Sequence, residues 1–463
     1  MADGIAAQAP QPTDGLTPQQ QRWARVAIFT ALAMASLDTA IANVALPTIA
    51  AELKATPADV IWVVNVYHIA MVATLLPFGA LGEIIGHQRI YMFGLILFTV
   101  ASVACALAWS LDTLLIARVL QGLGAAGAMS VNAALVRTVY PPSQFGRGLG
   151  HNALVVATSF TFGPTIASGI LSVASWEWLF AINLPFGLAA IAISVKTLPK
   201  TSRATHRFDY VGALLAMSCL GLLITGIDSA AHHVAVPIVI AELVAGLVFG
   251  WLLLRRQAGH PAPMLPVDLF QRPLFALSAA TALCSFAVQG LAFVSLPFFF
   301  EEVLHRSAVE TGFFLTPWPL VVGIMAPIAG RLSDRHPAGL LGGIGLAMLG
   351  IGMVLLATLP PEPSIANIVW RMVICGAGFG FFQAPNMKAI MSSAPPGRSG
   401  GASGIVATAR LSGQSIGAAL AAFCFGLFGH SGATWALALG AGFAAIGCVM
   451  SFLRLLVRHP TDA

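Results

Sequence analysis

The stretch RVAIFTALAMASLDTAIANVALPTI (Arg25–Ile49) decides the fold, because it is apolar over the thickness of a bilayer and carries one acid, Asp38. A helix makes its backbone hydrogen bonds internally, and about 20 apolar residues of helix cross the hydrocarbon core. Thirteen more runs of spanning length follow, separated by polar, Pro or Gly breaks. The sequence therefore predicts an all-α membrane protein with fourteen transmembrane helices. The spans are expected near residues 25–49, 59–82, 89–110, 112–138, 147–172, 177–196, 208–228, 234–254, 273–300, 309–332, 338–358, 364–392, 400–428 and 432–456.

The composition excludes a water-soluble globule. Of 463 residues, 57% are hydrophobic and 9% are charged, whereas a soluble domain carries about 25% charged residues. No segment alternates as the strands of a membrane β-barrel do. The net charge of +5 does not indicate nucleic acid, because the basic residues are scattered. The six cysteines lie in apolar runs without a CxxC pair, so no disulfide, metal or other cofactor is predicted.

The basic residues also predict the orientation. With the N-terminus inside, eighteen of the 23 Lys and Arg residues fall on the inner side, and only Lys54 and Arg306 fall on the outer side. The other three, Arg118, Arg371 and Arg410, fall within spans. This bias follows the positive-inside rule, and one missing helix would destroy it. We therefore expect a multi-pass protein of the cell inner membrane with both termini in the cytoplasm.

A motif that occurs twice predicts that the chain consists of two related halves. GALGE (Gly79–Glu83) ends the second span, and GRLSD (Gly330–Asp334) ends the tenth. Two six-helix halves with an inserted helix pair explain this spacing, and secondary transporters use such repeats for alternating access. The N-terminal segment lacks the apolar core of a secretory signal, so the first helix is expected to be retained. The expected parts are 1–24 as a disordered cytoplasmic tail, 25–196 as the first half, 197–258 as the inserted pair (spans 7 and 8), 259–456 as the second half and 457–463 as a cytoplasmic tail.

Two other classes of membrane protein fit the sequence less well. An enzyme would need clustered catalytic groups, and the sequence contains no HExxH or Walker motif. A channel normally shows a charged ring or a filter loop, rather than two unlike six-helix halves. The sequence is therefore not that of an enzyme.

The motifs, taken in order, resemble one known family. They are LDTAIANVALP (Leu37–Pro47), GALGEIIGHQR (Gly79–Arg89), ARVLQGLGAA (Ala117–Ala126), FGPTIASG (Phe162–Gly169), WEWLFAINLPFG (Trp176–Gly187) and RFDYVGALL (Arg207–Leu215). Over nearly its whole length the chain resembles the fourteen-helix drug:proton antiporters of the major facilitator superfamily. It departs from their pattern at Glu83 and Ile84, where the family usually has Asp and Arg, and at Glu177, where Arg is common.

The resemblance implies a proton-coupled antiporter, a multidrug efflux protein that exports hydrophobic, cationic drugs or biocides across the cytoplasmic membrane. Export of a metabolite, lipid or siderophore by the same mechanism is the alternative. The expected partners are protons, a small-molecule substrate and the lipid bilayer, without nucleic acid, and the protein is expected to act as a monomer.

Asp38 and Arg118 are the candidates for proton coupling. Burial makes the charged form of a carboxylate costly, so a proton or a cationic substrate can compete for Asp38. An intramembrane guanidinium must face a cavity or a partner, and the resemblance implies that Arg118 takes part in coupling. Structural roles remain open for both, Asp38 as a helix-capping acid and Arg118 as a scaffold bonded to carbonyls.

Gating is assigned to the repeated loop motifs and to the bend in the fifth span. Pro and Gly bend helices, and small residues let neighbouring helices seal or slide. The loop acids and their basic neighbours are expected to latch the halves, with solvated loop charges as the alternative. The candidate gating residues are Gly79, Glu83, Arg89, Gly163, Pro164, Gly330, Asp334 and Arg335, with Arg331 near Asp334.

Polar and aromatic side chains inside the spans of the two halves are the candidates for a substrate cavity. An aromatic cavity with one buried acid suits a lipophilic cation. His68 is interpreted as a packed neutral histidine, and the roles of Glu242, Arg371 and Arg410 stay open. The candidate substrate-binding residues are Asp38, Asn43, Tyr67, Gln121, Asn152, Gln289, Phe293, Trp318, Gln383 and Asn386.

Overall fold

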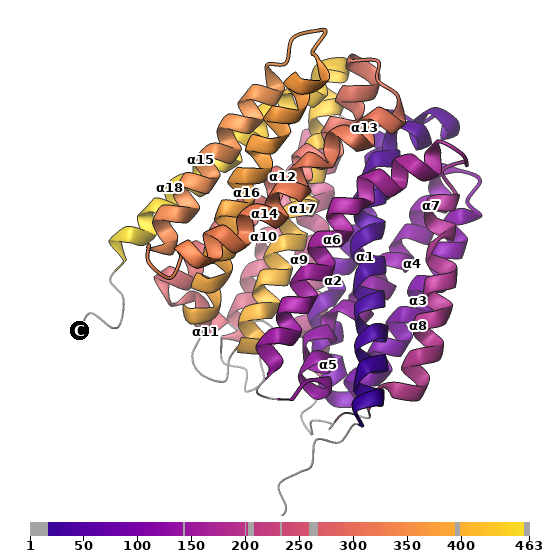
Figure 1. Ribbon diagram of the computed structural model, residues 1–463, viewed down its shortest axis with the longest axis vertical. Helices are drawn as coiled ribbons and strands as arrows, with labels where there is room; N and C mark the ends of the chain where they lie inside the picture. The colour runs from indigo at the N-terminus through magenta and orange to yellow at the C-terminus, as the bar shows by residue number, and fades with distance from the viewer. Residues whose placement is uncertain are drawn as a thin grey trace, which may run out of the picture.

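The chain folds into a bundle of membrane-length helices. The computed structural model describes residues 17–141, 144–199, 201, 208–231, 234–258, 267–393 and 399–457, so most of both predicted tails lies outside the described residues. Within these residues fourteen helical segments are long and apolar enough to cross a bilayer, which confirms the predicted all-α fold with fourteen spans (Figure 1). The helices are α1 (Pro18–Leu53), α2 (Pro57–Ile85), α3 (His87–Ala106), α4 (Leu111–Ser130), α5 (Asn132–Val139), α6 (Phe145–Leu171), α7 (Trp178–Ala181), α8 (Asn183–Thr197), α9 (Tyr210–Ala231), α10 (Val236–Gln257), α11 (Val267–Phe270), α12 (Pro273–Phe298), η2 (Phe299–Val303), α13 (Ala308–Leu315), α14 (Pro317–Leu332), α15 (Ala338–Ala357), α16 (Ile365–Ser393), α17 (Ser399–Phe428), η3 (Gly429–Ser431), α18 (Gly432–Leu453) and η4 (Arg454–Leu456).

The first helix begins earlier than the sequence predicts. Thr17 is its N-cap, and its side chain accepts a hydrogen bond from the backbone N–H of Gln20. The Gln20 side chain bonds back to the cap, which makes a capping box. Residues 18–24 are therefore helical, where the sequence places the end of a tail, because capping extends a helix beyond its apolar core.

The helix pairings of the first half recur in the second half. In the first half α1 packs on α6 and α8, α2 packs on α4, and α3 packs on α4 and α8. In the second half α12 packs on α17 and α18, α14 packs on α16, and α15 packs on α16 and α18. Each span of the first six thus occupies the place of the span eight positions later, which is the pattern of a structural repeat.

Three seams join the halves. Helix α1 contacts α12, α2 contacts α17, and α6 contacts α13 and α14. The inserted helices α9 and α10 pack on each other, and α9 also contacts α2 and α17. At the base of this pair the Asp209 carboxylate accepts hydrogen bonds from Gly212 N and from the Arg256 Nε, both at 2.9 Å. Helix α10 exposes large apolar side chains such as Leu247, as a lipid-facing helix must.

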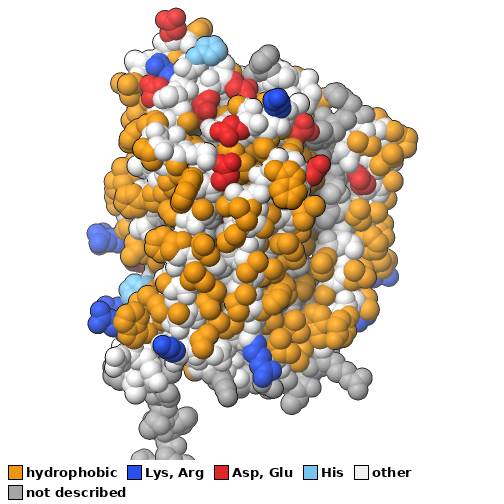
Figure 2. All heavy atoms as spheres, turned by 90° about the vertical axis from the view of Figure 1, so that its right-hand side faces the viewer, with side chains coloured by type: hydrophobic (Ala, Val, Ile, Leu, Met, Phe, Trp, Pro, Cys, Tyr) orange, Lys and Arg blue, Asp and Glu red, His pale blue; other side chains and the backbone are white. Residues whose placement is uncertain are grey.

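Charge separates along the long axis of the bundle. Helix α1 begins at the lower end of the bundle in Figure 1, which we call the termini end, and we call the other end the opposite end. On the face shown in Figure 2, acidic side chains gather near the opposite end and most of the Lys and Arg lie toward the termini end. A broad hydrophobic surface lies between them.

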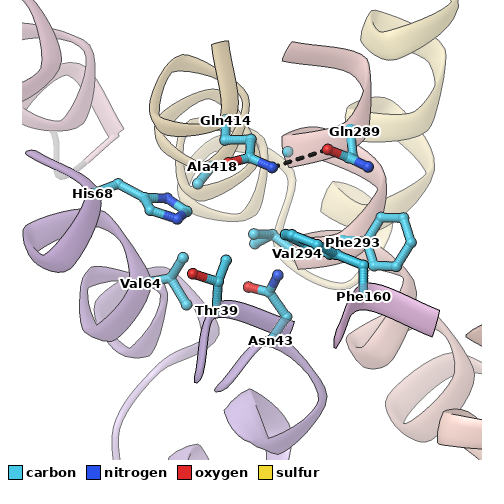
Figure 3. A pocket seen from close by; sticks show the side chains of 11 residues that line it. Thr39, Asn43, Val64, His68, Phe160, Gln289, Phe293, Val294, Gln414 and Ala418 are labelled. Carbon is cyan, nitrogen blue, oxygen red and sulfur yellow. Dashed lines mark hydrogen bonds between the residues drawn. The ribbon is translucent and has the colours of Figure 1, made fainter. Parts of the chain in front are cut away.

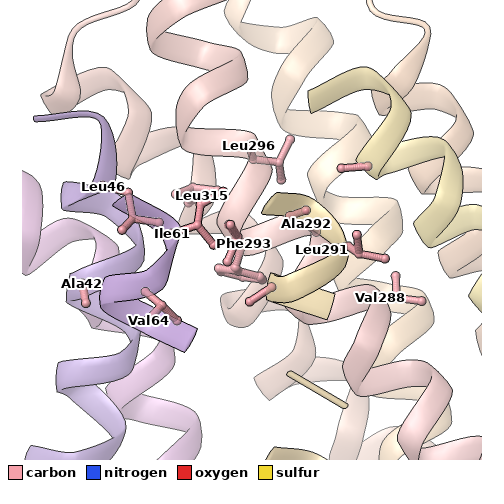
Figure 4. Close-up of a cluster of buried hydrophobic side chains, with 14 of the residues drawn as sticks. Ala42, Leu46, Ile61, Val64, Val288, Leu291, Ala292, Phe293, Leu296 and Leu315 are labelled. Carbon is pink, nitrogen blue, oxygen red and sulfur yellow. The ribbon is translucent and has the colours of Figure 1, made fainter. Parts of the chain in front are cut away.

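An apolar core joins the halves toward the opposite end. Leu46 of α1 and Ile61 of α2 belong to the same buried cluster as Leu296 of α12 and Leu315 of α13 (Figure 4). All four side chains are fully buried. The two halves are therefore in dry contact beyond the middle of the bundle, which encloses the site described next on that side.

Candidate functional site

Asp38 lies at the middle of α1 in a dense polar cluster. Its Oδ2 accepts a hydrogen bond from Arg118 Nη1 at 2.5 Å, and this contact is also an ion pair. Its Oδ1 accepts hydrogen bonds from Gln121 Nε2 at 2.8 Å and from Asn183 Nδ2 at 3.2 Å. The Asp38 side chain is 1% exposed. The sequence predicts Asp38 and Arg118 as separate candidates, and the structure brings them into direct contact.

Arg118 is held on every side. Its Nε donates to the Val63 carbonyl at 2.8 Å and its Nη1 donates to Gln121 Oε1 at 2.6 Å. The guanidinium carbon lies 4.2 Å from the centroid of the Tyr67 ring and 5.4 Å from that of Phe180, distances typical of cation–π contacts. Only Nη2 lacks a hydrogen-bond partner among the described residues. The positive and negative charges compensate each other, as buried ions require.

Glycines on α4 place Arg118 this deeply. A Cβ on Gly122 would lie 2.4 Å from the Tyr67 carbonyl oxygen, and a Cβ on Gly124 would lie 2.3 Å from Phe98 N. The α4 backbone therefore touches the backbones of α2 and α3, as small residues permit in membranes. This contact carries Arg118 to the Val63 carbonyl and toward Asp38.

Protonation of Asp38 would break its ion pair with Arg118. A proton on Asp38 would remove the charge that compensates Arg118, and the guanidinium would lose its partner in a dry site. Protonation and separation of the two side chains are thus linked. Because Asp38 lies on α1, Arg118 on α4 and Asn183 on α8, the link acts between helices.

A cavity lies between the halves directly beside this cluster. Thr39, the residue after Asp38, lines it together with Asn43 and His68 of the first half and Gln289 and Gln414 of the second. Figure 3 shows these side chains facing one another, with Phe160 and Phe293 beside them. The cavity contains about 260 Å³ of space free of atoms, and this space is so narrow that it holds about one water molecule. Within the wall that the second half contributes, Gln414 Nε2 donates a hydrogen bond to Gln289 Oε1 at 2.9 Å.

A second cavity of about 250 Å³ adjoins the first. The two share Thr39, Phe160 and Gln414, and the second is also lined by Ser36 and Arg410. Its other walls are apolar, including two methionines. Among the described residues that line the two cavities, Arg410 is the one with a charged side chain.

The pattern of membrane helices and the site between two repeated halves match a known family. The family model of the Major Facilitator Superfamily matches residues 28–418. The chain belongs to the Major Facilitator Superfamily. It is therefore a membrane transporter and not an enzyme.

The transporter resembles several bacterial proteins of this kind. It is 51% identical to the uncharacterized transporter YebQ of Escherichia coli (strain K12), over 96% of this chain and 97% of that one. It is 30% identical to the riboflavin transporter RibZ of Clostridioides difficile (strain 630), over 86% and 87% of the two chains. It is also 30% identical to the multidrug resistance protein Stp of Mycobacterium tuberculosis (strain CDC 1551 / Oshkosh), over 85% and 74%. The structure of a bacterial homolog to the human lysosomal transporter Spinster, in an inward-facing conformation, matches with a TM-score of 0.68 at 15% identity, over 95% and 97%, and this likeness concerns the fold alone.

The structure sorts the predicted substrate-binding residues into three groups. Asn43, Gln289 and Phe293 line the first cavity. Asp38, Tyr67 and Gln121 instead belong to the buried ion-pair cluster. The others line neither cavity. Asn152 bonds Asn132, Asn386 bonds Arg454, Trp318 packs on Phe293 with ring centroids 5.4 Å apart, and Gln383 is half-buried on α16.

His68 is buried, in agreement with its interpretation as a packed histidine, and it also faces the first cavity. Its side chain is 2% exposed. Neither Nδ1 nor Nε2 has a hydrogen-bond partner among the described residues. The sequence favours a packed neutral histidine and does not indicate its neighbours. The faces opposite His68 come from α12 and α17, more than 200 positions away, so no local pattern indicates them.

Arg454 is a polar centre that the sequence does not reveal. Its Nη1 donates to Asn386 Oδ1 at 2.6 Å and to Ser278 Oγ at 3.1 Å, and it is 4% exposed. In the sequence Arg454 reads as an inner-side charge at the end of the last span. In the structure it bonds α12 and α16 to the end of α18, a structural role that also accounts for Asn386.

The small face of α6 closes the seam with α13. Ser168 Oγ donates to the Ala308 carbonyl at 3.0 Å, and the hydroxyls of Thr165 and Thr316 lie 2.9 Å apart. A Cβ on Gly312 would lie 2.5 Å from the Pro164 carbonyl oxygen. Pro164, predicted as a gating residue, therefore stands at a backbone contact between the halves.

Gly163, the other predicted gating residue of this helix, serves a contact within the first half. A Cβ there would lie 2.5 Å from the Ala40 Cβ on α1. The position therefore allows α6 to approach α1 two residues after Asp38.

The loop acid of the second half pairs with a residue that the sequence does not indicate. Asp334 Oδ1 lies 2.6 Å from Lys388 Nζ of α16, and Lys388 also donates to the Ser333 carbonyl at 3.0 Å. The hydrogen bond from Lys388 holds the pKa of Asp334 below its usual range. The pair lies within the second half, whereas the sequence suggests Arg331 and Arg335 as partners.

The remaining loop candidates lie at the termini end. Glu83 and Arg89 are exposed there. Gly79 and Gly330 have open surroundings, since a Cβ on either would meet no atom closer than 3.8 Å. Gly82 is the tightly packed glycine of this motif, because a Cβ there would lie 2.6 Å from a Val131 methyl. Among the described residues, no three His, Cys, Asp or Glu side chains converge on a metal site.

Proposed function

We propose that the protein is a proton-coupled antiporter that exports small organic molecules across the inner membrane. One observation carries this proposal. The ion pair of Asp38 and Arg118 lies immediately beside a cavity between two repeated halves, and Thr39 joins the two sites along α1. A proton and a substrate can therefore act on the same helix.

Coupling follows from the geometry of α1. When Asp38 binds a proton, Arg118 loses its counter-charge and the bonds from α4 and α8 to α1 weaken. Helix α1 also contacts α6 within its half and α12 across the seam. A change in its position therefore alters both the cavity wall and the contact between the halves, as alternating access requires.

The direction of transport follows from topology. The termini end carries most of the basic side chains, so we assign it to the cytoplasm by the positive-inside rule. The apolar cluster and the α6–α13 seam close the opposite, outer end. In this arrangement substrate enters from the cytoplasm, and protons from outside drive its release.

The substrate proposed here is not a cation. The sequence suggests a cation because an open carboxylate would attract one. In the structure Asp38 is occupied by Arg118, and no carboxylate lines either cavity among the described residues. The neutral amide and imidazole groups of the first cavity favour a polar aromatic molecule instead. The relatives RibZ, a riboflavin transporter, and Stp, a multidrug resistance protein, support a metabolite and a drug equally.

The proposal is tested in inside-out membrane vesicles that contain the transporter, with an acidic lumen. Uptake of fluorescent riboflavin and of ethidium is followed with the pH gradient imposed and after nigericin collapses it. Proton antiport predicts gradient-dependent accumulation above vesicles without the transporter, and a substrate that is not a cation predicts that riboflavin rather than ethidium accumulates. Uptake that ignores the gradient for both compounds would refute proton coupling for them.

A further inference from the structure

We infer that the cavity binds organic anions, with Arg410 as the partner of the negative group and His68 as a hydrogen-bonding partner of the molecule's polar edge. This inference rests on the proposed function only in taking the cavity as the transport site. It names the substrate class, which neither the fold nor the relatives supply.

Within the described residues, Arg410 is the exception among the arginines that lie buried or half-buried in the helices. Arg118 has Asp38, Arg454 has Asn386, and Arg371 donates to the Leu355 carbonyl and to Asn367. No hydrogen bond or ion pair found among the described residues involves the Arg410 guanidinium. An arginine does not lose its proton in a protein, and an unpaired charge within a membrane marks a pathway for a ligand or an ion.

Arg410 gives the lining of the two cavities a net positive charge. Asp38 and Arg118 compensate each other within the neighbouring cluster, and the other polar side chains of the two cavities are hydroxyls, amides and one imidazole. The unpaired positive charge therefore attracts an anion and repels a cation. Ser36, which lines the same cavity as Arg410, offers a hydroxyl donor to the same negative group.

His68 supplies the second half of the recognition. Both ring nitrogens are without partners among the described residues, although the side chain is 2% exposed and faces the cavity (Figure 3). Asn43 Oδ1 on the same wall also has no partner. Buried polar atoms in this state are satisfied when a ligand brings complementary groups. Phe160 and Phe293 beside them offer aromatic faces.

These contacts together describe the ligand. It carries a negative group at the Arg410 end, an aromatic body between the two phenylalanines, and a hydrogen-bonding edge toward His68. Each cavity holds about one water molecule in this closed arrangement, so the ligand enters only when the halves part. Thr39, Phe160 and Gln414 belong to both cavities, so one molecule in the widened space can contact both sets of residues. Aromatic carboxylates and sulfonates have this form.

Equilibrium dialysis with the purified transporter in nanodiscs tests the inference. Three radiolabelled compounds share one ring system and differ in charge: 2-naphthoate, 2-naphthamide and 2-naphthylmethylammonium. Empty nanodiscs give the lipid background. The wild-type protein is expected to bind 2-naphthoate at least about tenfold more tightly than the ammonium compound, a difference of about 1.4 kcal/mol.

Variants assign the preference to side chains. Arg410→Gln should weaken 2-naphthoate binding at least about tenfold and leave 2-naphthamide within about threefold, while Arg410→Lys should keep most of the preference. His68→Phe should weaken 2-naphthoate and 2-naphthamide alike. Arg371→Gln is the matched control, because this arginine lies inside a span but lines neither cavity. Size-exclusion chromatography checks the folding of each variant.

Several results would overturn the inference. They are a preference for the ammonium compound, an absence of saturable 2-naphthoate binding, or 2-naphthoate binding that Arg410→Gln leaves unchanged. If Arg410→Gln aggregates, the charge preference of the wild type and the Arg410→Lys result still decide. Binding needs no proton gradient, so the two tests can fail separately. If the wild-type protein shows no preference for the anion but uptake still depends on the gradient, the inference is rejected and the antiport proposal stands. If the protein prefers the anion but uptake does not depend on the gradient, the antiport proposal is rejected and the inference stands.

Discussion

Asp38 and Thr39 are neighbours in α1 but belong to different sites. Asp38 is bonded to Arg118 at 2.5 Å and is not among the residues that line the cavities, while Thr39 lines both. Asp38, which we assign to the proton, is thus one residue away from Thr39, which lines the cavity that we assign to the substrate. The two ligands need not compete for one atom, because they act on the same helix.

The stability of the cluster should depend on balance of charge. Arg118→Gln leaves Asp38 as a buried, uncompensated carboxylate, and breaking a buried pair in this way costs about 3–5 kcal/mol. The double variant Asp38→Asn, Arg118→Gln has no uncompensated charge and should recover most of that loss. The midpoint of SDS-induced unfolding in detergent measures both, with Arg255→Gln on the exposed face of α10 as the control. Equal losses in the single and double variants would show that the pair does not stabilise the fold.

The seam between α6 and α13 should tolerate no side chain at Gly312. A Cβ there would lie 2.5 Å from the Pro164 carbonyl oxygen, and overpacking of this kind costs about 1–3 kcal/mol. Gly312→Ala should therefore destabilise the closed outer seam and slow transport by about tenfold. Gly323→Ala in α14 is the control, because its Cβ would meet nothing within 4 Å.

The same variant should expose the cavity from outside. A cysteine introduced by Asn43→Cys should react faster with an impermeant thiol reagent when Gly312→Ala is also present, after subtraction of the parent protein's labelling. Unchanged labelling and unchanged transport in Gly312→Ala would exclude this seam as the outer gate.

The Asp334–Lys388 pair should not set the pH profile. The hydrogen bond from Lys388 lowers the pKa of Asp334, so the pair persists above that lowered pKa and is lost only as the pH falls through it. An unperturbed Asp titrates near pH 4, and the pair is therefore intact throughout pH 5–8. Asp334→Asn should change the rate of transport by the same factor at every pH in this range. A shift in the midpoint of the profile would contradict this assignment.

Membrane potential should drive the export of an anion. Exchange of one monovalent anion for one proton moves two positive charges inward, and each is worth about 2.3 kcal/mol per 100 mV. In proteoliposomes, a valinomycin-imposed potential, negative on the cytoplasmic side, should accelerate 2-naphthoate export. Exchange of a monovalent cation for a proton would be electroneutral, so a rate that ignores the potential would contradict anion exchange.

The fold was predictable because each span is a local signal. Apolar length marks a helix in a bilayer, and the order of Lys and Arg fixes which breaks are real. The start of α1 at Pro18 was not predictable from hydropathy, since the capping box of Thr17 and Gln20 lies in a polar stretch. Arg454 was read as a surface charge, because an arginine that ends a span usually reaches the interface rather than Asn386.

Only the charged residues of the site, whose burial in the membrane costs the most free energy, could be predicted from the sequence. Asp38 and Arg118 stand out because charge is rare in hydrocarbon, yet their contact joins positions 80 residues apart. His68 and Arg410 can be recognised as cavity residues only once α2 and α17 are known to pack against each other. Such contacts depend on packing between the halves, and no periodicity within one helix encodes them.

The central claim is that Asp38 carries the proton and does not hold the substrate. It is tested most directly by comparing two modes of transport in Asp38→Asn proteoliposomes: accumulation of substrate driven by a pH gradient, and exchange of labelled for unlabelled substrate without a gradient. We predict that the variant loses accumulation and keeps exchange at a rate close to that of the wild type, because Asn cannot take up a proton and Asp38 is not among the side chains that line the cavity. Gradient-driven accumulation that survives in Asp38→Asn would contradict the claim.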